Sequence, residues 1–106
     1  MLTKINSSHA PEQVINAIET LYHHGKIADI LDRAPKLLEK YPDTPFLYNM
    51  LGVIHFHKGL KQEATNYFSK TIDLLPDDPN AYNNLGNVLK EEKKYNEAIL
   101  NYEKVI

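Results

Sequence analysis

Residues 79–87, PNAYNNLGN, have a close copy 34 positions earlier at residues 45–53, PFLYNMLGV. Both segments begin with proline, place a Tyr-Asn pair three residues later and continue with a Leu-Gly pair. The identity extends further along the chain, to a Glu-Ala pair at residues 63–64 and again at residues 97–98. A repeat of this length indicates an array of similar supersecondary units.

The glycines and prolines follow the same period, because all four glycines and five of the six prolines have a counterpart 34 residues away. The matched sets are Gly25 with Gly59, Gly52 with Gly86, Pro11 with Pro45 and Pro79, and Pro42 with Pro76. Proline suits the first turn of a helix, where its missing N–H has no intrahelical partner. Glycine suits a turn that needs a positive φ. The spacing therefore predicts helix–turn–helix units.

Each unit is predicted to contain two helices. The first begins at the proline, with Thr44 and Asp78 as capping residues in the second and third units, and extends to about residue 24, 58 or 92. The second helix shows apolar residues three and four positions apart, as in residues 95–106. It ends before Pro42 and Pro76, because proline does not continue a helix.

This pattern of Tyr-Asn-x-Leu-Gly, Glu-Ala and a following aromatic resembles the tetratricopeptide repeat (TPR). The matching residues are Tyr48, Leu51, Gly52, Gly59, Ala64, Phe68 and Pro76 in one unit, and Tyr82, Leu85, Gly86, Tyr95, Ala98 and Tyr102 in the next. The resemblance implies an all-α, right-handed superhelical solenoid of three hairpins. We expect an N-terminal arm at 1–10 and a single TPR domain at 11–106, with units 11–44, 45–78 and 79–106, the last incomplete.

The first unit departs from the family pattern. Ile18 and Ile30 stand where the other units have glycine and alanine, the small residues that let paired helices approach closely. Ala34 stands where the other units have an aromatic ring. We therefore expect bulk to have moved along this hairpin, with altered packing. Pro35 falls within the second helix and is expected to kink it.

Four asparagines, Asn80, Asn83, Asn84 and Asn87, lie at the spacing of a single helix face in the third unit. An amide carries both a donor and an acceptor, so it matches the N–H and C=O of an extended peptide. In TPR arrays the first helices line a concave groove, and the resemblance places this face in the groove wall. The alternative is that these amides are solvated surface groups.

The TPR region of O-linked GlcNAc transferases has a similar asparagine ladder, and its positions correspond here to Asn16, Met50 and Asn84. The second unit adds an apolar wall around Met50, since methionine adapts to loosely specified ligands. The predicted peptide-binding residues are Asn16, Phe46, Asn49, Met50, Val53, Asn80, Asn83, Asn84 and Asn87.

The sequence therefore predicts a protein–protein interaction scaffold that binds a peptide or a partner surface in the concave groove. The alternative is an N-terminal, substrate-positioning region of a larger glycosyl- or sulfotransferase-type enzyme. The chain has no nucleophile elbow, phosphate loop or HExxH motif, so we do not expect it to be an enzyme by itself.

The composition of the chain argues against nucleic acid and membrane as partners. A net charge of −2 and a single arginine, Arg33, argue against nucleic acid, and no apolar run is long enough for a membrane helix. There are no cysteines for a disulfide or a thiolate metal site.

His23 and His57 are one period apart, but no third ligand clearly converges on them, and His55 is read as a core residue. We expect a cytoplasmic protein without metal or cofactor.

The C-terminal helix is expected to expose an apolar patch, because no following unit covers it. The residues concerned are Ile99, Leu100, Val105 and Ile106, with Val88 and Leu89 of the preceding helix. Such patches usually mark an interface. The expectation is that the chain is a fragment or forms a homo-oligomer through this end.

Overall fold

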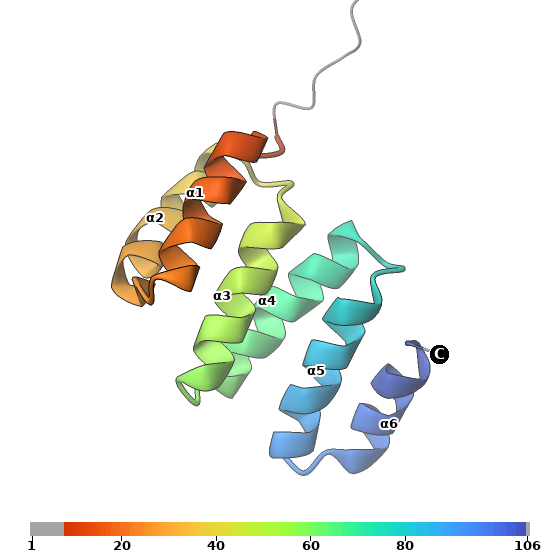
Figure 1. Ribbon diagram of the computed structural model, residues 1–106. Helices are drawn as coiled ribbons and strands as arrows, with labels where there is room; N and C mark the ends of the chain where they lie inside the picture. Colours follow the sequence, from red (N-terminus) through yellow and green to blue (C-terminus); the bar gives the residue numbers. More distant parts are fainter. Residues whose placement is uncertain (1–7, 106) are drawn as a thin grey trace, which may run out of the picture. The chain divides into compact units, whose positions relative to one another are not determined.

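The computed structural model describes residues 8–105, which form six α-helices and no strand (Figure 1). The helices are α1 (Glu12–His23), α2 (Ile27–Lys40), α3 (Pro45–His57), α4 (Lys61–Leu74), α5 (Pro79–Glu91) and α6 (Tyr95–Glu103). The all-α prediction is confirmed, and the first helix of each pair ends one residue from its predicted limit. Two compact units divide the chain, Met1–Leu47 and Tyr48–Ile106. The grouping of all hairpins into a single superhelical domain stays a prediction.

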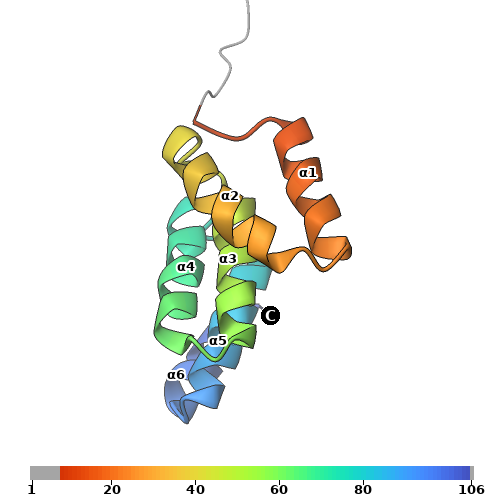
Figure 2. The same cartoon turned by 90° about the vertical axis from the view of Figure 1, so that its left-hand side faces the viewer.

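In the first unit, α1 and α2 are joined by a turn at Gly25, which has a φ of +69°. Ile18, Ile30 and Ala34 are all buried, in agreement with the predicted exchange of bulk between the two helices. Pro35 lies inside α2, as predicted, and the helix continues through it. In the view of Figure 2, α1 and α2 diverge from the turn that joins them.

The hydroxyl of buried Thr44 connects two parts of this unit. It accepts a hydrogen bond from the Ala10 N–H at 2.8 Å and donates one to the carbonyl of Tyr41 at 2.9 Å. A capping role was predicted for Thr44, and the structure shows that its hydroxyl serves this other connection. Capping by Asp78 is confirmed, because its Oδ1 accepts from the Asn80 N–H at 3.1 Å.

The compact unit Tyr48–Ile106 has its core where α4 meets α5. The buried residues there are Ala64, Phe68 and Val88. Val53, Phe56 and Leu85 pack against them. The expectation that Val88 and Leu89 belong to an exposed end is wrong. Both are buried, and Val88 packs in the core with Ala64 and Phe68 of α4, the second helix of the preceding hairpin.

The other part of the predicted apolar end is exposed. Ile99 and Leu100 on α6 have 53% and 60% of their surface accessible, and Val105 is also exposed. Ile106 lies outside the described residues. Self-association through this face stays a prediction.

The close approach predicted at Gly52 of α3 and Gly86 of α5 is confirmed. A Cβ added at Gly52 would lie 2.5 Å from Cε1 of Phe68, and one added at Gly86 would lie 2.6 Å from Cε1 of Tyr102. Each ring therefore occupies the volume that a side chain at the facing glycine would need.

The third hairpin turns without glycine. Lys93, one period after Gly59, has a φ of +62° in the position where Gly59 has +79°. A left-handed conformation costs an L-residue roughly 1–2 kcal/mol, whereas glycine adopts it without steric cost.

Lys93→Gly is therefore expected to raise the free energy of unfolding by roughly 0.5–1 kcal/mol, after the extra chain entropy of glycine is subtracted. Urea denaturation measures the change. The matched control is Lys94→Gly, whose native φ of −88° gives no strain to relieve and should lower stability. Equal effects of the two substitutions would show that the turn is unstrained.

Candidate functional site

The amide face of α5 is divided between exposed and half-buried side chains. Asn80 and Asn83 are exposed, whereas Asn84 and Asn87 are half-buried. The two half-buried amides each have a hydrogen-bond partner on another helix. The face is therefore not a uniform solvated surface.

Asn84 is joined to Asn49 of α3, since its Nδ2 donates a hydrogen bond to Asn49 Oδ1 at 3.0 Å. The bond uses one N–H of Asn84 and one lone pair of Asn49. Within the described chain neither side chain makes a further hydrogen bond. The pair therefore presents an NH2 group on Asn49 and a carbonyl oxygen on Asn84.

Asn87 has a different role. Its Oδ1 accepts a hydrogen bond from the Tyr102 hydroxyl at 2.6 Å, which ties α5 to α6 within the third hairpin. Sequence reasoning placed Asn87 with the ligand-binding amides and Tyr102 in the packing. The signal for their connection is the tyrosine hydroxyl itself, which needs a partner when its ring is packed between helices.

The residues of the predicted apolar wall around Met50 differ in the compact unit to which they belong. Met50 is half-buried on α3, and half-buried Val53 packs against the core of the second unit. Phe46 is half-buried and Asn16 is exposed, and both belong to the unit Met1–Leu47. Their participation in one site with the Asn49–Asn84 pair stays a prediction.

His55 is the histidine that the sequence predicts to lie in the core. His55 has its Nδ1 2.7 Å from the carbonyl oxygen of Leu51, and its ring centroid lies 5.1 Å from that of Tyr67, which confirms it as a packed histidine. Among residues 8–105 there is no group of three or more metal-ligating side chains. No helix within the same range is long and apolar enough to cross a membrane.

Successive hairpins with a glycine–aromatic contact and a 34-residue period define a helical repeat protein. Two family models, both described as tetratricopeptide repeat, match residues 47–78 and 79–106, which together make up more than half of the chain. The chain therefore belongs to the tetratricopeptide repeat family. Repeats of this family generally mediate protein–protein interactions, and proteins built from them are typically non-enzymatic scaffolds. None of the curated proteins matches the chain.

Proposed function

We propose that this protein binds an extended peptide segment of a partner protein, with the Asn49–Asn84 pair contacting the peptide backbone. The observation that carries the proposal is the hydrogen bond between the two amides, which leaves one donor group and one acceptor oxygen side by side. A peptide unit offers the complementary carbonyl and N–H. The pair therefore matches any sequence in an extended conformation.

The mutual hydrogen bond also lowers the entropic cost of binding. A free asparagine loses side-chain rotamer freedom when a ligand immobilises it. Asn49 and Asn84 already restrain each other in the unbound protein. Exposed Asn80 and Asn83 extend the polar face along α5, and half-buried Met50 offers an adaptable apolar contact beside Asn49.

The alternative function, substrate positioning for a transferase domain, has no specific support in this chain. The transferase alternative predicts the same groove, with an enzyme substrate bound in it in place of a partner peptide. The interaction-scaffold proposal is preferred because the Asn49–Asn84 pair by itself accounts for recognition of a peptide backbone.

The probe for this site is a peptide selected from a random 12-residue phage library on the immobilised chain. Asn84→Ala is expected to weaken its binding about tenfold, since two neutral hydrogen bonds of about 0.5–1.5 kcal/mol each depend on the pair. Isothermal titration calorimetry measures the affinity. The matched control is Asn66→Ala, an exposed asparagine on α4 that should leave affinity unchanged.

A backbone substitution in the probe distinguishes backbone recognition from side-chain recognition. Replacing each peptide amide in turn by an ester removes a single N–H. One such replacement should weaken binding to the unmodified protein and have no further effect on the Asn84→Ala variant. Unchanged affinity of a folded Asn84→Ala variant, or ester effects that simply add to the mutation, would contradict the proposal.

A further inference from the structure

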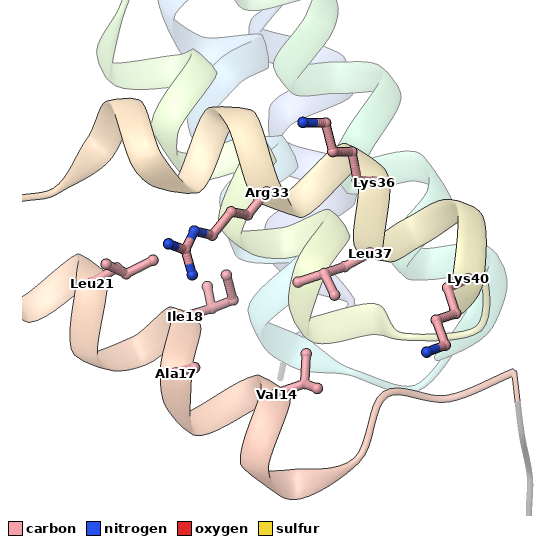
Figure 3. A pocket seen from close by; sticks show the side chains of 8 residues that line it. All are labelled: Val14, Ala17, Ile18, Leu21, Arg33, Lys36, Leu37 and Lys40. Atoms are coloured by element: carbon pink, nitrogen blue, oxygen red, sulfur yellow. The ribbon is translucent and has the colours of Figure 1, made fainter.

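The unit Met1–Leu47 contains a pocket of about 350 Å³ between α1 and α2 (Figure 3). Its apolar residues are Val14, Ala17, Ile18 and Leu21 of α1 with Leu37 of α2, and its charged residues are Arg33, Lys36 and Lys40 of α2. No acidic side chain lines it. The pocket thus combines an apolar floor with a cationic border.

The first hairpin has no aromatic ring at the position equivalent to Phe68. In the second hairpin Phe68 fills the volume against Gly52, but the equivalent residue of α2 is Ala34. Ile18 lines the pocket without a ring beside it. Val14 and Leu21 of α1 and Leu37 of α2 are half-buried, although Val14 and Leu21 have the spacing of a packed helix face.

The cations form a row along α2. Arg33, Lys36 and Lys40 are three and four residues apart, so they share a face that extends about 10 Å along the helix axis. Lys36 is 3.3 Å from Asp32, and both side chains are largely exposed. Within the described chain Arg33 and Lys40 have no acidic partner, and Lys40 lies over the ring of Tyr41 at 5.4 Å. Arg33 and Lys40 are therefore available to pair with acidic groups of a ligand.

The apolar floor has a matching length. Val14, Ala17, Ile18 and Leu21 extend over two turns of α1, as Arg33 and Lys40 extend over two turns of α2. A helix that lies in this space presents apolar residues three and four positions apart to the floor. Acidic residues two turns apart on the same helix then reach Arg33 and Lys40.

We propose that this pocket is a second docking site, distinct from the Asn49–Asn84 pair, which receives the apolar face of an acidic amphipathic helix from a partner protein. A small amphiphile is a poorer match, because sites for small molecules bury most of their ligand, whereas Ala17 of the floor is exposed and Val14 and Leu21 are only half-buried. Residues 1–7, MLTKINS, have the wrong charge for this border, since their only charged side chain is Lys4.

Two synthetic helical peptides test the proposal. Both carry leucine at positions i, i+3, i+4 and i+7, and their flanking charged residues are glutamate in one and lysine in the other. The ¹⁵N-labelled full chain is titrated with each peptide and followed by NMR. The glutamate peptide is expected to bind at least tenfold tighter and to shift the amide resonances of α1 and α2 most strongly.

Variants of the chain separate the two features of the site. The double change Arg33→Glu and Lys40→Glu should reverse the preference between the two peptides. The control is the double change Lys58→Glu and Lys90→Glu, which alters the net charge equally at exposed positions outside the pocket. It should not reverse the preference. Ala17→Leu fills the pocket from an exposed position, so it should weaken binding about tenfold without unfolding the chain. Asn84→Ala should have no effect on this peptide.

Three results would overturn the proposal. The first is equal affinity for the two peptides, and the second is a preference that survives the double charge reversal. The third is tighter binding of dodecanoate than of the glutamate peptide at the same resonances, which would assign the pocket to small anionic amphiphiles.

Discussion

Gly52→Leu is expected to lower the free energy of unfolding by about 3 kcal/mol, and Gly86→Leu by about 1–2 kcal/mol. Both substitutions place carbon atoms in the volume of an aromatic ring, at nearly the same distance from it. The difference arises from the ring. Phe68 is 1% exposed and packed in the core with Ala64 and Val88, so it has no space to move into.

Tyr102 is only half-buried, and its ring can turn toward solvent. That movement costs its hydrogen bond to Asn87, which contributes about 1 kcal/mol. Urea denaturation followed by circular dichroism measures both variants. Ile18→Leu in the first hairpin is the volume-conserving control and should cost less than about 1.5 kcal/mol. Equal losses at Gly52 and Gly86 would show that the freedom of the facing ring does not determine the cost.

The order and limits of the helices could be predicted because they depend on local backbone chemistry. Proline at the start of α3 and α5, and glycine in the first two turns, restrict the backbone wherever the chain goes afterwards. The contacts of Gly52 and Gly86 could also be predicted, because in each hairpin a missing side chain on one helix is matched by a ring on the other.

The third turn shows the limit of such local reasoning. A lysine in the sequence does not predict a positive φ, and at Lys93 the geometry of the hairpin imposes this conformation. The burial of Val88 and Leu89 was missed because helical periodicity shows that a face is apolar without showing which neighbour covers it. Periodicity likewise grouped four asparagines together, although Asn87 bonds a tyrosine of its own hairpin.

The pocket of the first unit was beyond prediction for a related reason. The sequence indicated that bulk had been exchanged between Ile18 and Ala34. Whether helices close over a smaller residue or leave a space depends on how far the backbone relaxes, and the cost of an unfilled site varies widely with that relaxation. The pairing of Asn49 with Asn84 similarly depends on side-chain rotamers on separate helices.

Phe68→Ala is expected to lower the free energy of unfolding by about 3–5 kcal/mol, the usual cost of removing a fully buried aromatic ring from a core. The volume it vacates lies against Gly52, whose added Cβ would otherwise meet the ring. The first hairpin already combines an isoleucine and an alanine at the equivalent positions, Ile18 and Ala34.

The effect of Gly52→Ile on the free energy of unfolding should therefore change sign with the residue at position 68. In the unmodified protein it overpacks against Phe68 and destabilises, whereas in the Phe68→Ala variant it fills the vacated volume and should restore about 1–2 kcal/mol. A double-mutant cycle by urea denaturation measures the coupling. Gly86→Ile in the Phe68→Ala background is the matched control, because Tyr102 still occupies the volume that its side chain would need. If both isoleucines restore stability equally, the gain comes from replacing a helical glycine, and the two kinds of hairpin do not exchange volume between these positions.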